Sequence, residues 1–204
     1  MLFSDSYQTI EQPAECIYKS KGSRFMAFAF PVGSEKEVKL RLETLRNMYP
    51  DASHHCYAYV LNYDKSLSRA SDDGEPSNTA GKPILRQIQK LDLTNVLVVV
   101  VRYFGGTLLG VPGLIEAYGQ SAMECLKLCR INRHEVYEKY ELSTSFGLEK
   151  DIYRICKQFQ VQLSVKQNQE CFCAEIKIPL QQVEAFKQQL KAYYQVDIKY
   201  TGIE

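Results

Sequence analysis

The sequence predicts an α+β protein of two domains, and three observations point to this class. In residues 25–129, segments with strand-type composition alternate with segments whose apolar residues recur at helical spacing. The run "NVLVVVVRYF" is β-branched on both faces, which is typical of a central strand covered on both sides. From residue 134 the order becomes βαββαβ, the ferredoxin-like arrangement. We therefore expect domains at 1–131 and 134–204.

The elements of the first domain follow from composition and spacing. The segments "FMAFAFPV" (25–32) and "HHCYAYVL" (54–61) are rich in aromatic and small apolar residues, so we expect strands. Apolar residues at i, i+4 and i+7 predict an amphipathic helix between them and another after residue 80. These residues are Val38, Leu42 and Leu45, then Ile84, Ile88 and Leu91. A third helix, from about Gly113 to Cys129, is apolar over most of its circumference, which predicts deep burial.

The second domain is expected to hold strands near 136–145, 161–165, 171–178 and 195–200, with helices near 148–159 and 183–190. This order also fits an RNA-recognition domain, which needs stacking aromatic residues on its open sheet face. Phe172 shares its face with Ala174 and Ile176, which have the character of a core. We therefore expect an interaction or structural module without that stacking surface.

The composition indicates a cytoplasmic, globular protein. The chain has 204 residues, a net charge of +1 and seven cysteines, an odd number that does not resemble a secreted disulfide framework. The N-terminus lacks the features of a signal peptide, and the longest strongly apolar run, Val96–Val101, is too short to span a bilayer. Neither a membrane association nor a general nucleic-acid-coated surface is expected.

The acidic loop in "SRASDDGEPSNTAGKPIL" is the first candidate site. It carries Asp72, Asp73 and Glu75 with no intervening lysine. Three roles are open for these acids: they bind a hard cation, they pair with arginines and fix the shape of the loop, or they are solvated. The spacing does not match an EF-hand, and we expect no metal.

The end of this segment begins a helix near Lys82. Six residues separate Gly74 from Gly81, and Pro83 follows Lys82, so the segment is not a P-loop. Either the helix-start amides bind an anion beside Lys82, or Asn78 or Thr79 caps the helix.

The segment "VRYFGGTLLGVPG" is the second candidate site. It places Arg102 and Tyr103 at the end of a buried strand, followed by Gly105 and Gly106. Because the spacing is not G-x-G-x-x-G, no dinucleotide cofactor is expected. The glycines form either a tight connection or a backbone that approaches a ligand or a partner.

The segment "SHHCYAY" gives the remaining candidates. His54 is a candidate polar site residue, or a hydrogen-bonded strand histidine. A zinc site built from His54, Cys56, Cys125 and Cys129 lacks the paired spacing of structural zinc motifs. Activation of Cys56 by His55 is disfavoured because a strand points neighbouring side chains apart.

Three long blocks resemble the signature of the IMPACT (YigZ-like) family: "SDDGEPSNTAGKPIL", "NVLVVVVRYFGGTLLG" and "GLIEAYG". The resemblance implies an N-terminal α/β sandwich on a mixed sheet, similar to domain IV of elongation factor G. It implies a C-terminal domain similar to that factor's ferredoxin-like domain V. It also makes Tyr118, in the third block, a candidate binding residue. Asn78, Pro112 and Glu116 depart from the family pattern.

The resemblance further implies a link to translation, because eukaryotic relatives bind an activator of a translation-control kinase. We expect a translation-associated binding module that engages RNA, the ribosome or a translation factor. Its surface would combine the acidic loop with Lys82, Arg102 and the glycine corner, which is formed by Gly105 and Gly106. The acids would orient the two cations. The alternative is a small enzyme acting on a phosphorylated or nucleotide-like compound, with one of the acids as base and His54 as acid.

Overall fold

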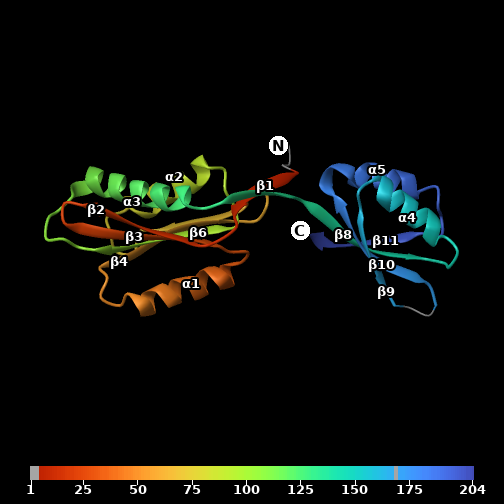
Figure 1. Ribbon diagram of the computed structural model, residues 1–204, viewed down its shortest axis with the longest axis horizontal. Helices are drawn as coiled ribbons and strands as arrows, with labels where there is room; N and C mark the ends of the chain where they lie inside the picture. Colours follow the sequence, from red (N-terminus) through yellow and green to blue (C-terminus); the bar gives the residue numbers. More distant parts are fainter. Residues whose placement is uncertain (1–4, 168–169) are drawn as a thin grey trace. The chain divides into compact units, whose positions relative to one another are not determined.

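The computed structural model describes residues 5–167 and 170–204, which form two compact units. The larger unit is Tyr7–His134, and the smaller one comprises Glu135–Glu204 with the described residues before Tyr7. Figure 1 colours the helices and strands by their position in the chain. Their presence in both units confirms the α+β class. Among the described helices, none combines the length and apolar character needed to cross a lipid bilayer.

The larger unit is built on a five-stranded sheet with the order β2-β3-β6-β4-β5. Its strands are β2 (Ala14–Ser20), β3 (Ser23–Pro31), β4 (His54–Leu61), β5 (Leu67–Ser71) and β6 (Val96–Tyr103). Every neighbouring pair is antiparallel, so the expectation of a mixed sheet was wrong. The two helical crossovers do join parallel strands, β3 to β4 and β5 to β6. In each case, however, another strand lies between the two parallel strands.

Three helices cover this sheet: α1 (Glu35–Met48), α2 (Gly81–Lys90) and α3 (Gly110–Lys127). Figure 1 shows α1 on one face and α2 with α3 on the other. All residues of Val96–Val101 are buried, which confirms that this strand is covered on both sides. Val96, Val98 and Val100 belong to the core under α2 and α3, while the alternate residues belong to the core under α1.

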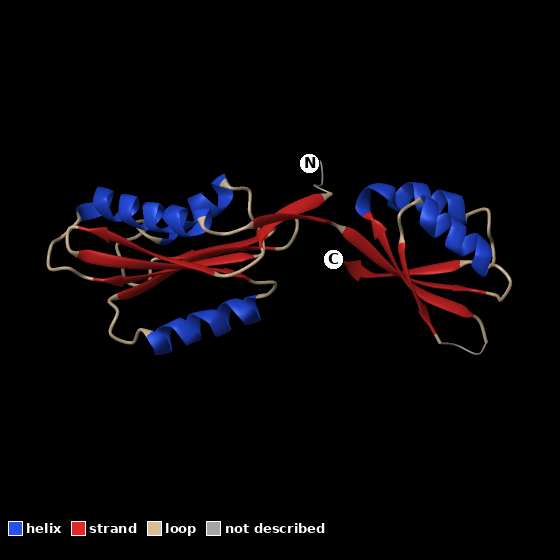
Figure 2. Cartoon of the chain, in the orientation of Figure 1, coloured by secondary structure: helices blue, strands red, loops and turns tan. Residues whose placement is uncertain are grey.

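The smaller unit has a four-stranded antiparallel sheet with the order β11-β8-β10-β9. Its elements are β8 (Tyr137–Thr144), α4 (Glu149–Gln158), β9 (Gln162–Lys166), β10 (Phe172–Pro179), a 3-10 turn (Leu180–Gln182), α5 (Val183–Leu190) and β11 (Asp197–Ile203). This βαββαβ topology is the predicted ferredoxin-like one. Figure 2 shows both helices packed against one face of the sheet. Phe172, Ala174 and Ile176 lie in the core, as their pattern indicated.

The sequence patterns missed four of the described strands. These are β1 (Ser6–Ile10) and β7 (Ile131–Glu135), which pair with each other, and the edge strands β2 and β5. Every residue of β7 is exposed, so no buried face marks it in the sequence. Helix α3 begins at Gly110, three residues before the expected start at Gly113. Whether the segments 1–131 and 134–204 fold independently stays a prediction.

Candidate functional site

Asp72, the first residue of the loop after β5, caps helix α2. Its Oδ1 accepts hydrogen bonds from the amides of Ala80 and Gly81 at 3.0 and 2.8 Å, and its Oδ2 accepts one from Asn78 at 2.8 Å. We expected capping by Asn78 or Thr79, and this was wrong; the alternative, an anion bound beside Lys82, stays a prediction that the position of Asp72 disfavours. Asp72 instead places its own negative charge where an anion would interact with the helix dipole.

The two expected capping residues have other roles in the loop. Asn78 has a φ of 65°. The Thr79 hydroxyl donates a hydrogen bond to the carbonyl oxygen of Pro76 at 2.7 Å. These local interactions use both residues to shape the turn before α2, which leaves capping to Asp72.

Asp73 holds the loop against strand β4. Its Oδ1 accepts a hydrogen bond from Arg46 at 3.0 Å, and its Oδ2 accepts one from the amide of His55 at 2.7 Å. Its carbonyl oxygen lies 2.8 Å from Nδ1 of His54. A carbonyl oxygen can only accept, so Nδ1 of His54 must carry the hydrogen. In neutral His54, Nε2 is therefore a hydrogen-bond acceptor.

Glu75 and Arg102 form a buried ion pair. Nη1 of Arg102 donates to Oε1 of Glu75 at 2.6 Å, and the two side chains are 7% and 4% exposed. Tyr118 donates a second hydrogen bond to the same oxygen at 2.7 Å. The guanidinium also lies 5.4 Å from the ring centre of Phe25 and 5.6 Å from that of Phe104. Two fixed donors and two aromatic rings hold the pair in one geometry.

The expected surface that joins Lys82 with Arg102 is not present. Lys82 is exposed at the start of α2, whereas the guanidinium of Arg102 is buried beside Glu75. Tyr103 is on the opposite face of β6 from Arg102, where it is partly buried against the core under α1, because neighbouring strand residues alternate. Arg24 lies over the Tyr103 ring at 4.7 Å. Strand alternation alone separates Tyr103 from Arg102.

Behind the ion pair, Tyr118 and Cys56 close the site from the core. Both are buried, and Sγ of Cys56 lies 2.9 Å from the Asp72 carbonyl and 3.3 Å from the Tyr118 hydroxyl. Burial raises the pKa of the Cys56 thiol and of the Tyr118 hydroxyl far above their ordinary values. Cys56 therefore stays protonated and is no nucleophile. Within the described residues, no three side chains of a type that binds metals come together.

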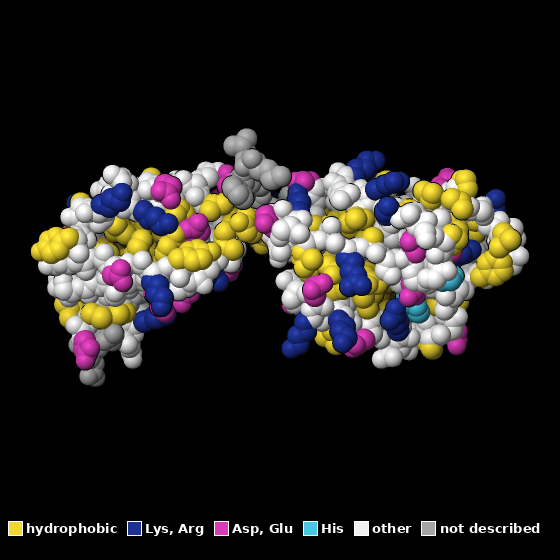
Figure 3. Space-filling model, turned by 180° about the vertical axis from the view of Figure 1, so that it is seen from behind, with side chains coloured by type: hydrophobic (Ala, Val, Ile, Leu, Met, Phe, Trp, Pro, Cys, Tyr) yellow, Lys and Arg dark blue, Asp and Glu magenta, His cyan; other side chains and the backbone are white. Residues whose placement is uncertain are grey.

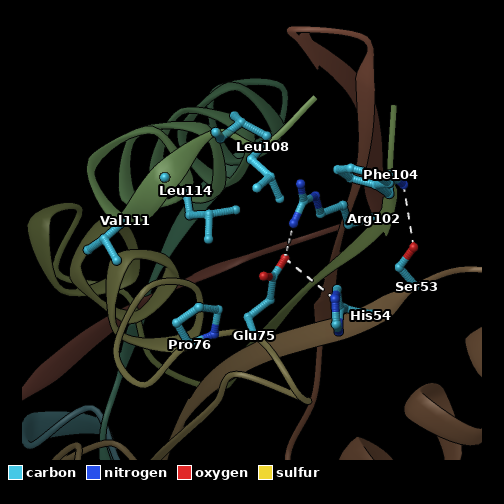
Figure 4. Close-up of a pocket in the computed structure, with 11 residues that line it drawn as sticks. Ser53, His54, Glu75, Pro76, Arg102, Phe104, Leu108, Val111 and Leu114 are labelled. Carbon is cyan, nitrogen blue, oxygen red and sulfur yellow. Dashed lines mark hydrogen bonds and ion pairs between the residues drawn. The ribbon is translucent and has the colours of Figure 1, made fainter. Parts of the chain in front are cut away.

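The front of the ion pair opens into a groove of about 580 Å³ (Figure 4), a volume within the usual range of ligand sites. One wall is apolar and exposed: Phe104 is 49%, Leu108 84% and Val111 52% exposed. The groove is lined by Ser53, His54, Glu75, Pro76, Arg102, Phe104, Leu108, Leu109, Gly110, Val111 and Leu114. At its polar end, Nε2 of His54 lies 3.8 Å from Oε1 of Glu75. We call this feature the β6–α3 groove.

The glycine corner sets the position of the apolar wall. A Cβ at Gly105 would lie 1.9 Å from the carbonyl carbon of Gly22, so only glycine allows this contact with the β2–β3 turn. Gly106 has a φ of +83°, which also favours glycine. The hydroxyl of Ser23 accepts a hydrogen bond from the Gly105 amide at 3.2 Å. The glycines therefore serve the tight connection that carries the chain from Arg102 to Leu108.

The candidate residues from the sequence fall into four groups. His54, Glu75 and Arg102 line the groove, and Asp72, Asp73 and Tyr118 hold the loop or the ion pair from outside it. Gly105 and Gly106 shape the connection, while Lys82 and Tyr103 lie elsewhere. Sequence reasoning missed the apolar wall. The available signal was the unusual presence of Leu108 and Val111 in a glycine-rich connection.

Comparison with known proteins assigns this fold to a family. A model of the Impact N-terminal domain matches residues 21–126. The chain is 30% identical over 194 residues to the IMPACT family member YigZ of Escherichia coli, covering 94% of this chain and 95% of that protein. The chain belongs to the IMPACT family. It is also 40% identical over 121 residues to the IMPACT family member YvyE of Bacillus subtilis, and this match spans 56% of that protein.

A solved structure supports the same assignment. The crystal structure of a hypothetical protein superposes with a TM-score of 0.70 at 28% identity and covers 98% of both chains. All residues that line the β6–α3 groove fall inside 21–126, the segment matched by the Impact N-terminal domain. The groove therefore belongs to the part of the chain that defines the IMPACT family.

Proposed function

We propose that this protein is a translation-associated binding module that receives a polypeptide segment of a translation factor or ribosomal protein in the β6–α3 groove. The observation that carries the proposal is an exposed apolar wall in the same groove as polar groups that are held in place, His54 and the Glu75–Arg102 pair. Leu108 and Val111 expose apolar surface at the rim of a concave site, an arrangement that marks interaction sites. The connection with translation rests on the resemblance of the signature blocks.

The charges of the groove favour a polypeptide over the RNA backbone. Phosphate groups are bound by lysine and arginine side chains that are free to contact them. Among the lining residues Arg102 is the single arginine, with no lysine, and it is already paired with Glu75. On the face shown in Figure 3, basic, acidic and hydrophobic side chains are mixed rather than gathered by kind. RNA engagement is therefore the weaker form of the proposal.

Co-sedimentation with purified ribosomes that retain their bound factors tests the proposal. We expect Leu108→Asp to reduce the bound fraction at least fivefold, because a charge would be placed on the apolar wall. Leu40→Asp is the matched control, since Leu40 is 60% exposed on α1, across the sheet. Binding to naked ribosomal RNA should be weak for all three proteins.

Equal binding by wild type and Leu108→Asp would contradict the groove proposal. Tight binding to naked RNA that is lost in Lys82→Glu would instead support an RNA surface at the start of α2.

A second candidate function is an enzyme that acts on a phosphorylated or nucleotide-like compound in the same groove. The observation in its favour is the orientation of His54, whose Nε2 lies 3.8 Å from Oε1 of Glu75. A histidine held through Nδ1 in this way can take up a proton at Nε2. The paired state of Arg102 disfavours a phosphate substrate. Turnover of a nucleotide or sugar-phosphate panel that disappears in His54→Gln would establish the enzyme.

A further inference from the structure

The polar end of the β6–α3 groove is rich in hydrogen-bond acceptors. Oε1 of Glu75 receives the donors of Arg102 and Tyr118. In the part of the chain that the structure describes, Oε2 receives no hydrogen bond, and it is not among the buried unpaired atoms. Figure 4 shows this second oxygen turned from Arg102 toward the side of the groove where Leu114 lies. A side chain that is 4% exposed thus presents one unused acceptor to the groove.

His54 adds a second acceptor at the same place. Its Nδ1 hydrogen is engaged by the carbonyl oxygen of Asp73 at 2.8 Å, so neutral His54 presents a lone pair at Nε2. Nε2 lies 3.8 Å from Oε1 of Glu75, too far for a direct hydrogen bond. Oε2 of Glu75 and Nε2 of His54 are thus two acceptors at the same end of the groove, and they favour a ligand that supplies donors.

The surrounding charges are largely paired, which leaves the free oxygen of Glu75 as the contact for a ligand. The loop contributes the carboxylates of Asp72, Asp73 and Glu75, and the arginines paired with the loop are Arg46 and Arg102. Asp72 is satisfied by backbone amides rather than by a cation. The charge of Asp72 lies at the start of α2, outside the groove, while the charge of Glu75 inside the groove is paired with Arg102. A positive group would therefore act through Oε2 of Glu75, the oxygen that Arg102 and Tyr118 leave free, and burial strengthens such a contact because it lowers the effective dielectric.

We infer that the β6–α3 groove recognises a lysine or arginine side chain of its polypeptide partner, flanked by apolar residues, and this inference rests on the proposed function. The cationic head meets Oε2 of Glu75 and Nε2 of His54. The aliphatic stem lies along Leu114, since long basic side chains cover apolar surface while their heads reach polar groups. The flanking apolar residues of the partner pack on Phe104, Leu108 and Val111, which are exposed at the rim.

Three capped tripeptides test this inference on the full chain. Each has leucine at both ends, and the central residue is lysine, norleucine or glutamate. Binding is followed by chemical-shift changes of backbone amides in a titration of the isotope-labelled protein. We expect the lysine peptide to bind at least tenfold more tightly than the norleucine peptide, a difference of about 1.4 kcal/mol. The glutamate peptide should bind most weakly, and the shifts should centre on Ser53, Glu75 and Val111.

Variants separate the contribution of charge from that of the apolar wall. Glu75→Gln should bring the lysine peptide to the affinity of the norleucine peptide. Because Glu75→Gln also alters a buried pair, His54→Phe provides a second variant, and it should weaken the lysine peptide selectively. Leu108→Ala should weaken the lysine and norleucine peptides by a similar factor, since Leu108 contacts only the apolar flanks.

The failure of this inference differs from the failure of the proposed function. If the norleucine or glutamate peptide binds the groove as tightly as the lysine peptide, cation recognition is wrong while polypeptide binding stands. If no peptide shifts the groove residues and an RNA oligonucleotide does, the proposed function and the inference both fall.

Discussion

Replacing Arg102 by methionine should severely destabilise the protein, although the sequence alone placed this arginine on a functional surface. The substitution leaves the Glu75 carboxylate 4% exposed, with the Tyr118 hydroxyl as its remaining hydrogen-bond donor. Methionine preserves most of the volume between Phe25 and Phe104, so the main effect is electrostatic. Breaking a buried ion pair from one side costs about 3–5 kcal/mol, a large part of a typical unfolding free energy.

A double-mutant cycle isolates this effect. Glu75→Gln removes the charge that Arg102→Met leaves unpaired, so the double variant should recover at least about 1 kcal/mol relative to Arg102→Met alone. Lys82→Glu is the control for a general charge change. Because Lys82 is exposed, its substitution should change stability by no more than about 0.5 kcal/mol.

Urea unfolding followed by far-ultraviolet circular dichroism measures these free energies, and an unchanged m-value would show that the same surface is exposed in each variant. The reasoning would be refuted if Arg102→Met remained within about 1 kcal/mol of wild type and the two substitutions were additive. That result would mean that water already solvates Glu75 in the folded protein.

Three further predictions concern pH, helix capping and domain structure. The unfolding free energy should fall as pH rises above about 9, by about 1.4 kcal/mol per pH unit for each proton involved. In the unfolded chain Cys56 and Tyr118 ionise with their ordinary pKa values of 9.0 and 10.0, whereas burial raises both pKa values in the folded protein. Tyr118→Phe should therefore make the unfolding free energy, measured by urea titration at alkaline pH, fall less steeply with pH. Asp72→Ala should destabilise the protein by about 1–2 kcal/mol in urea, and Asp72→Asn by less, because an amide oxygen still accepts from the helix amides. Fragments 1–131 and 134–204 should each retain helical and strand signals in circular dichroism, and loss of both would show that the two segments depend on each other.

The sequence predicted the elements with strong periodicity and missed the interactions that link distant elements. The valine-rich strand β6 and the ferredoxin-like order were both predicted, because their patterns extend over whole elements. The three acids of the loop were singled out together, but their separate roles depend on partners far along the chain. Glu75 meets Arg102 and Tyr118, which are 27 and 43 residues away in sequence. No local pattern encodes such pairings.

The burial of Arg102 shows where sequence reasoning failed for a physical reason. Strand parity alone assigns Arg102 to the same side as Val98 and Val100, facing α2 and α3. A charged residue at a strand end was nevertheless interpreted as a surface cation, because arginine is seldom buried unless it is paired. The pairing depends on the approach of the acidic loop to β6, which the sequence does not reveal. The apolar wall was missed because exposure of Leu108 and Val111 depends on where α3 begins.

The strand order of the larger unit has a consequence for how the protein folds during synthesis. Strand β6 lies between β3 and β4, yet it leaves the ribosome about 40 residues after β4. At 5–20 residues per second this interval is roughly 2–8 s. During that time the hairpins β2–β3 and β4–β5 each have an inner edge with unpaired backbone groups. Arg102 is part of β6, so Glu75 has no cationic partner until β6 is inserted between β3 and β4. The groove therefore forms only when the five-stranded sheet is complete.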